Sequence, residues 1–125
     1  MRNITFTLVL SGLFYSSQDR LQLVDSNIKY TDLPSEVKVH IFKGEFVDLN
    51  NPNKYSIESY QTLLPWVYES RLIRLKDNKA YQLDFDGEYD HLTFIIKDDY
   101  LYKTNNYNIY EHDSLKYTFA KYLID

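Results

Sequence analysis

Hydrophobic and polar residues alternate along much of this chain with a period of two, which is typical of half-buried β-strands. The pattern is clearest over residues 71–104, where four short strands with turns between them are predicted. Similar runs predict strands over residues 36–42, 46–49, 55–59, 63–68 and 107–112. The chain therefore reads as a series of short strands, most of them joined by tight turns.

The turn that contains Asp86-Gly87 sets the register of one predicted hairpin. A four-residue loop pairs Leu83 with Leu92 and Tyr81 with Phe94, so that apolar residues share one face. A two-residue loop mixes the faces, and a slip of one residue would turn a strand inside out. The four-residue loop is therefore predicted.

A second predicted hairpin follows directly. Lys97-Asp98-Asp99 is a polar break, and a three-residue loop there pairs Ile96 with Tyr100 and Phe94 with Tyr102. Asn50-Asn51-Pro52-Asn53 is the clearest turn signal elsewhere in the chain. Together these patterns predict a meander in which each strand runs antiparallel to its neighbour.

The predicted fold is mainly β, an antiparallel meander of about eight short strands that forms a small barrel or a strongly curved sheet. The alternative is an α+β fold with a helix at 35–43, at 114–123, or at both. The carboxyl-terminal stretch fits either state, because Leu115, Tyr117 and Phe119 alternate while Leu115, Phe119 and Tyr122 share a helical face. The strand is preferred there because Tyr-Thr-Phe is strongly β-prone.

Residues 1–17 have the layout of a secretory signal peptide. Arg2 precedes an uncharged apolar run from Ile4 to Tyr15, and Ser16-Ser17-Gln18 follows. The run is too short for a transmembrane helix. We therefore expect a secreted or periplasmic protein whose residues 18–125 form a single β-rich domain, with a buried first strand as the alternative for the amino-terminal segment.

Composition narrows the class of partner. The 125-residue chain has 14 basic and 18 acidic residues, a net charge of −4, and no cysteine. A nucleic-acid partner is not expected, because phosphate recognition requires a basic face. Tyrosine is unusually frequent, with 13 residues, which suits strands and also suits amphipathic contact surfaces.

The candidate metal-binding and acid–base residues lie in one acidic stretch of the chain. Asp84, Asp86 and Asp90 precede His91, and carboxylates with histidine are ligands for metals and groups for acid–base catalysis. The match to a calcium loop is partial, because the Asp-x-Asp-x-Asp-Gly spacing and the later bidentate glutamate are missing. An ordinary acidic hairpin loop with a solvated histidine is therefore the preferred interpretation. In that register Asp84 lies opposite His91 and pairs with it.

The preferred function is a non-enzymatic binding module, without a cofactor, for a small apolar ligand or for another protein at a tyrosine-rich surface. The alternative is a small enzyme or metal-binding protein that uses His91 and the nearby carboxylates. The candidate binding residues are the single tryptophan and four tyrosines, Trp66, Tyr68, Tyr100, Tyr102 and Tyr110.

Two resemblances at the level of pattern accompany these predictions. The exported layout, the Gly44-x-Phe46 strand start and the run of hairpins resemble the lipocalin-like small secreted barrels over roughly residues 36–124. Phe46 stands where those barrels have the tryptophan of Gly-x-Trp. Residues 32–37, Asp-Leu-Pro-Ser-Glu-Val, are similar to the helix start of PepSY-like secreted domains, which implies a helix over 35–43.

Overall fold

The computed structural model describes residues 19–61, 63, 68–83, 93–106 and 109–125. Within them the chain forms nine strands, one α-helix and two 3-10 helices. The strands are β1 (Asp19–Arg20), β2 (Gln22–Lys29), β3 (Phe46–Asp48), β4 (Tyr55–Gln61), β5 (Tyr68–Arg74), β6 (Lys79–Gln82), β7 (Phe94–Lys97), β8 (Tyr100–Thr104) and β9 (Thr118–Leu123). The helices are η3 (Tyr30–Asp32), α1 (Ser35–His40) and η4 (Glu111–Lys116).

The strands form two sheets, so the prediction of a mainly β fold is confirmed. Sheet A has the order β1-β6-β5-β4, and sheet B has the order β2-β9-β8-β7-β3. The chain passes between the sheets three times, from β1 to β2, from β3 to β4 and from β6 to β7. No ladder joins the two sheets among the described strands, so these strands do not show a closed barrel.

The pairing also corrects the predicted meander. β1 pairs with β6 in parallel, and β3 pairs with β7 in parallel. The other described ladders are antiparallel. Neither parallel pair joins consecutive strands: the chain passes through sheet B between β1 and β6, and through sheet A between β3 and β7.

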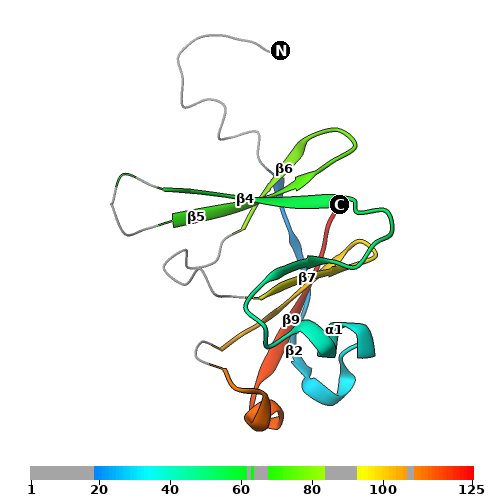
Figure 1. Cartoon of the computed structure of the whole chain (residues 1–125), viewed down its shortest axis with the longest axis vertical. Helices are drawn as coiled ribbons and strands as arrows, with labels where there is room; N and C mark the ends of the chain where they lie inside the picture. Colours follow the sequence, from blue (N-terminus) through cyan, green and yellow to red (C-terminus); the bar gives the residue numbers. More distant parts are fainter. Residues whose placement is uncertain (1–18, 62, 64–67, 84–92, 107–108) are drawn as a thin grey trace.

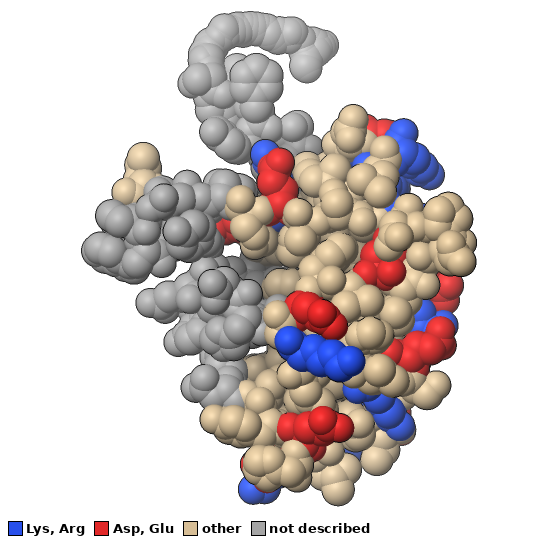
Figure 2. All heavy atoms as spheres, in the orientation of Figure 1, with Lys and Arg blue, Asp and Glu red and all other residues tan. Residues whose placement is uncertain are grey.

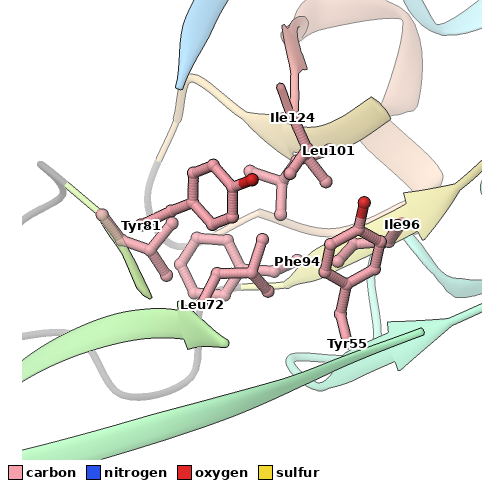
Figure 3. Packing of buried hydrophobic residues seen from close by; sticks show 8 residues of the cluster. Tyr55, Leu72, Tyr81, Phe94, Ile96, Leu101 and Ile124 are labelled. Atoms are coloured by element: carbon pink, nitrogen blue, oxygen red, sulfur yellow. The ribbon is translucent and has the colours of Figure 1, made fainter. Parts of the chain in front are cut away.

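The main core lies between the two sheets. Leu72 of β5 and Tyr81 of β6 are completely buried against Ile96 of β7 and Leu101 of β8. Figure 3 shows Leu72 and Phe94 between the rings of Tyr81 and Tyr55. Burial of each large aliphatic side chain contributes about 1.5–3 kcal/mol, so this cluster is the principal force that holds sheet A on sheet B.

A second core covers the opposite face of sheet B. Val37 and Ile41, in and just after α1, are completely buried with Ile95 of β7 and Phe119 of β9. Figure 1 shows α1 beside the sheet B strands, away from sheet A. Sheet B is thus the middle layer of three, and β7 buries both of its faces.

The strand predicted over 36–42 is wrong, and the α+β alternative is right about a helix there. Val37 and Ile41 lie four residues apart, on the same face of a helix, whereas Val39 remains 61% exposed. Pro34 is the N-cap residue with an extended ψ of 142°, so the helix begins at Ser35. The alternation of Val37, Val39 and Ile41 had suggested a strand, but only two of the three residues are buried.

The predicted pairing of Tyr81 with Phe94 is also wrong. Tyr81 pairs with Leu72 in sheet A, and Phe94 pairs with Lys103 in sheet B. Both residues still reach the same core cluster, but from opposite sheets. The predicted loop Asp86–Tyr89 and the pairing with Leu92 lie outside the described residues.

The hairpin of β7 and β8 exists, but its register differs from the prediction by one residue. Lys97 pairs with Tyr100 and Ile96 with Leu101, so the loop has two residues, Asp98 and Asp99. Asp98 adopts a φ of 56°, a left-handed conformation that aspartate tolerates in tight hairpins. The predicted register assumed one apolar face, but Ile95 and Ile96 are both fully buried.

Some of the remaining predictions are confirmed, and others are wrong or lie outside the described residues. β3, β4 and β9 confirm the strands predicted over 46–49 and 55–59 and the strand preference near the carboxyl end. The strand predicted over 107–112 is wrong at 109–112, where η4 begins at Glu111. Residues 50–52 bend as expected between β3 and β4. Residues 1–17, the predicted signal peptide, lie outside the described residues.

Candidate functional site

A groove opens where one end of sheet A meets one end of sheet B. Its volume is about 740 Å³, which is within the usual range for small-ligand sites. We call it the end groove. Its walls come from the start of β4, the end of β5, the β7–β8 turn and the end of β9, and its lining residues are Asn53, Lys54, Tyr55, Arg74, Leu75, Lys76, Asp99, Leu123, Ile124 and Asp125.

Asp48 fixes the wall that leads into β4. Its Oδ2 accepts hydrogen bonds from the main-chain N–H groups of Lys54 and Tyr55, at 2.7 and 2.9 Å. Its Oδ1 accepts from the main-chain N and side-chain Nδ2 of Asn50, at 2.9 and 2.7 Å. Asn53 donates in turn to the main-chain oxygen of Asp48 at 3.1 Å. One carboxylate therefore organises the entire connection between β3 and β4.

Tyr55 joins this wall to the β7–β8 turn. Its ring is buried in the main core, and its hydroxyl donates to Asp99 Oδ1 at 3.0 Å. Burial, followed by the hydrogen bond to Asp99, raises the pKa of Tyr55 well above its usual value. The hydroxyl therefore stays protonated at neutral pH, where it is a hydrogen-bond donor and not a base.

Arg74 closes the opposite wall. Its Nε and Nη2 donate to the two carboxylate oxygens of Asp77, at 3.0 and 2.8 Å. This bidentate contact from Arg74 holds the pKa of Asp77 at about 2, below its usual 3.8. Arg74 is thus locked in place by a neighbour that is not part of the groove.

Three donors converge on the main-chain oxygen of Asp125, which is one of the residues that line the groove. The Tyr81 hydroxyl donates to it from the core. Arg74 Nη1 and Lys79 Nζ approach the same oxygen at 3.4 Å each. These contacts fix the residues just after β9 against sheet A, so the fold also holds this wall of the groove in position.

The groove combines apolar and charged groups. Leu75, Leu123 and Ile124 contribute apolar surface, and three cationic and two acidic side chains line the groove together with Asn53 and Tyr55. Lys54 Nζ lies 3.9 Å from Asp99 Oδ1, and both side chains are 56% exposed. Figure 2 shows acidic and basic side chains interspersed over the visible face of the molecule. The groove therefore suits a ligand with an apolar body and polar or charged groups.

Two of the candidate tyrosines, Tyr100 and Tyr102, lie together on one face of β8, and Lys121 lies over both rings. Tyr102 is buried in the second core, and Tyr100 is half-buried beneath Lys121, whose Nζ lies 4.1 Å from the ring centroid. Tyr110 is 58% exposed and stacks on His112, at 5.7 Å between ring centroids. Tyr68 begins β5. Trp66 lies outside the described residues.

The acid–base candidates Asp84, Asp86, Asp90 and His91 also lie outside the described residues, so the predicted contact of Asp84 with His91 stays a prediction. Over the described ranges, no three His, Cys, Asp or Glu side chains come close enough together to hold a metal ion. His40 instead contacts Glu45, with Nδ1 3.4 Å from Oε1. Analysis of the purified protein for bound metal tests the alternative function directly.

The end groove was missed by the sequence analysis. Arg74 and Asp99 are 25 positions apart, and only the strand order brings them to the same end of the molecule. The only part of the groove that the sequence indicated was the turn at residues 50–53, because a turn between strands lies at the end of a sheet. That signal does not show which other loops meet it.

Comparison with known proteins adds no assignment: no family model, no curated protein and no solved structure matches this chain. Among the helices that the structure describes, none has the length and apolar character needed to cross a membrane.

Proposed function

We propose that this protein is a small exported binding module without catalytic activity and that its ligand binds in the end groove. The observation that carries the proposal is a groove of about 740 Å³ whose walls are fixed by Asp48, by the contact of Tyr55 with Asp99, and by the contact of Arg74 with Asp77. A site whose walls are already fixed binds its ligand more tightly, because less conformational entropy is lost when the ligand binds.

The ligand class follows from the lining. Apolar surface from Leu75 and Leu123 favours a molecule with an apolar body. The Tyr55 hydroxyl, whose proton is donated to Asp99, can accept a hydrogen bond, and the exposed Lys54 and Asp99 supply charges at the rim. The sequence led us to expect a small apolar ligand. The proposed ligand is instead amphiphilic and binds where the ends of the two sheets meet.

Export is part of the same proposal and rests on the layout of residues 1–17, with a basic start, an uncharged apolar run and small polar residues after it.

A fluorescent amphiphile tests the groove. We expect 1-anilinonaphthalene-8-sulfonate to bind the folded protein, because it carries both an apolar ring system and a charge. Leu75→Asn removes apolar surface from a wall residue that is 48% exposed. Loss of about half of a leucine's burial, roughly 1 kcal/mol, weakens binding about fivefold.

Leu115→Asn is the matched control, because Leu115 is 78% exposed in η4, outside the groove lining. It should leave the dissociation constant unchanged. Equal effects of the two substitutions, or no binding to the folded protein, would rule out the groove as the site. Circular dichroism of both variants verifies that the fold is kept.

A further inference from the structure

The loop between β5 and β6 forms one wall of the end groove and is held at both ends. At its start the Leu75 N–H donates to the main-chain oxygen of Lys54 at 2.9 Å, which ties the loop to the beginning of β4. At its end Asp77 Oδ1 accepts a hydrogen bond from the Lys79 N–H at 3.2 Å. Leu75 and Lys76 both line the groove, so the fold fixes the main chain that carries them.

Two pairs of opposite charges compensate each other at the groove. Arg74 donates to both carboxylate oxygens of Asp77. Lys54 Nζ lies 3.9 Å from Asp99 Oδ1, and the Tyr55 hydroxyl donates to the same oxygen at 3.0 Å. A charged ligand would compete with an existing partner at either pair, so neither pair selects the sign of the ligand's charge.

The charged lining residues that remain are Lys76 and Asp125. A nitrogen of Arg74 and another of Lys79 lie 3.4 Å from the main-chain oxygen of Asp125, so a cationic ligand would meet like charges beside it. Lys76 is exposed, and among the described residues it forms no ion pair. Its sequence neighbour Asp77 is already held by Arg74. A negative charge is therefore the one that the groove accepts most readily.

Apolar surface lies beside Lys76. Leu75 adjoins it in the loop and is 48% exposed, and Leu123 and Ile124 line the same groove. Burial of an apolar chain against these residues is favourable. The stem of a lysine side chain is flexible, so its ammonium group can follow an anionic head group that is attached to such a chain.

We infer that the ligand of the end groove is a single-chain carboxylate, with its head group at Lys76 and its apolar chain against Leu75. This inference rests on the proposed function and assigns the charge of the ligand in that groove. One uncompensated lysine matches one negative charge, which favours a carboxylate over a doubly charged phosphate. The net charge of −4 opposes this binding only weakly, because exposed charges more than about 8 Å apart are largely screened at physiological ionic strength.

Three probes of equal chain length test the sign of the charge: octanoate, octan-1-ol and octyltrimethylammonium. NMR titration of the isotope-labelled protein gives the dissociation constant of each probe from the shifts of the Leu75 and Leu123 amide signals. Octanoate should bind more tightly than octyltrimethylammonium. Lys76→Gln should weaken octanoate binding about two- to fivefold, the contribution of one exposed ion pair, and should leave octan-1-ol binding unchanged.

Two further variants sharpen the test. Lys76→Glu should reverse the order, so that octyltrimethylammonium becomes the tighter ligand. In concentrated sodium chloride, which screens exposed charges, wild type and Lys76→Gln should bind octanoate equally. Lys116→Gln is the matched control, because the Lys116 side chain is 76% exposed in η4, outside the groove lining, and it should change none of the three dissociation constants.

The outcomes separate this inference from the proposed function. If octan-1-ol shifts the groove amides but Lys76→Gln binds octanoate as tightly as wild type does, the groove is a binding site and the assigned charge is wrong. Tighter binding of octyltrimethylammonium than of octanoate by the wild type overturns the inference in the same way. If none of the three probes shifts the groove amides, the inference fails together with the proposed function.

Discussion

Substitution of Asp48 by asparagine should destabilise the protein far more than an ordinary surface change. The carboxylate accepts four hydrogen bonds, from the main chain of Asn50, Lys54 and Tyr55 and from the Asn50 side chain. An amide with the same shape keeps one oxygen acceptor but presents an NH₂ group toward two main-chain donors. The N–H groups of Tyr55, whose bond to Asp48 is partly buried, and of Lys54, whose bond is exposed, then lose their partner, at up to about 1–3 kcal/mol each.

Because the residue is only half-buried, water recovers part of this loss, and we expect a net cost of about 2–4 kcal/mol. Urea unfolding followed by circular dichroism measures it, and the change is a large part of a typical stability of about 5–15 kcal/mol. Asp25→Asn is the matched control, since the Asp25 carboxylate accepts one exposed bond, from Asn27 N at 2.9 Å. If both variants lose less than about 1 kcal/mol, the Asp48 contacts do not organise the turn.

Three further predictions follow from the core, the ion pair and the amino-terminal segment. Phe94→Ala should cost about 3–5 kcal/mol in urea unfolding, because Phe94 is 8% exposed in the main core; a loss below about 1 kcal/mol would contradict that placement. Because the folded pKa of Asp77 is lowered from 3.8 to about 2, its stabilising effect is complete above pH 4 and is lost as the pH falls toward 2. The difference in melting temperature between wild type and Asp77→Asn should therefore shrink over that interval, and a constant difference would argue against the pair. Mass spectrometry of the protein from its own host should show cleavage near Ser17-Gln18, whereas an intact Met1 terminus in the exported fraction would exclude the signal peptide.

The sequence predicts strand content well where one face of a strand is buried and the other is solvated. Over Tyr55–Gln61 the alternation of Tyr55 and Ile57 with polar residues matches their packing against the core. It fails for β7, because Ile95 and Ile96 both lie in cores on opposite sides of the sheet. With no polar face, periodicity carries no information about register, and the hairpin loop was assigned one residue too many.

The helix at Ser35–His40 shows a second limit. Val37, Val39 and Ile41 fit a strand by alternation and a helix by the spacing of Val37 and Ile41, so burial alone decides between them. That burial is provided mainly by Ile95, Tyr102 and Phe119 of sheet B, which lie more than 50 positions further along the chain. The end groove was unpredictable for the same reason, because it exists only once β4, β5, the β7–β8 turn and β9 share an end.

Because sheet B is the middle layer, its strands should open less readily than the strands of sheet A. Its main-chain amides are shielded by sheet A on one side and by α1 on the other, so the β7 and β8 amides should exchange with deuterium only on wide opening of the fold. Sheet A has a core on one face, and its strands exchange through smaller fluctuations. The end groove spans this boundary, with Lys54 and Leu75 on the more mobile layer and Asp99 and Ile124 on the protected one. A ligand in the groove would therefore contact both layers and restrain sheet A against sheet B. It would slow deuterium uptake in β4 and β5 without altering it in β7.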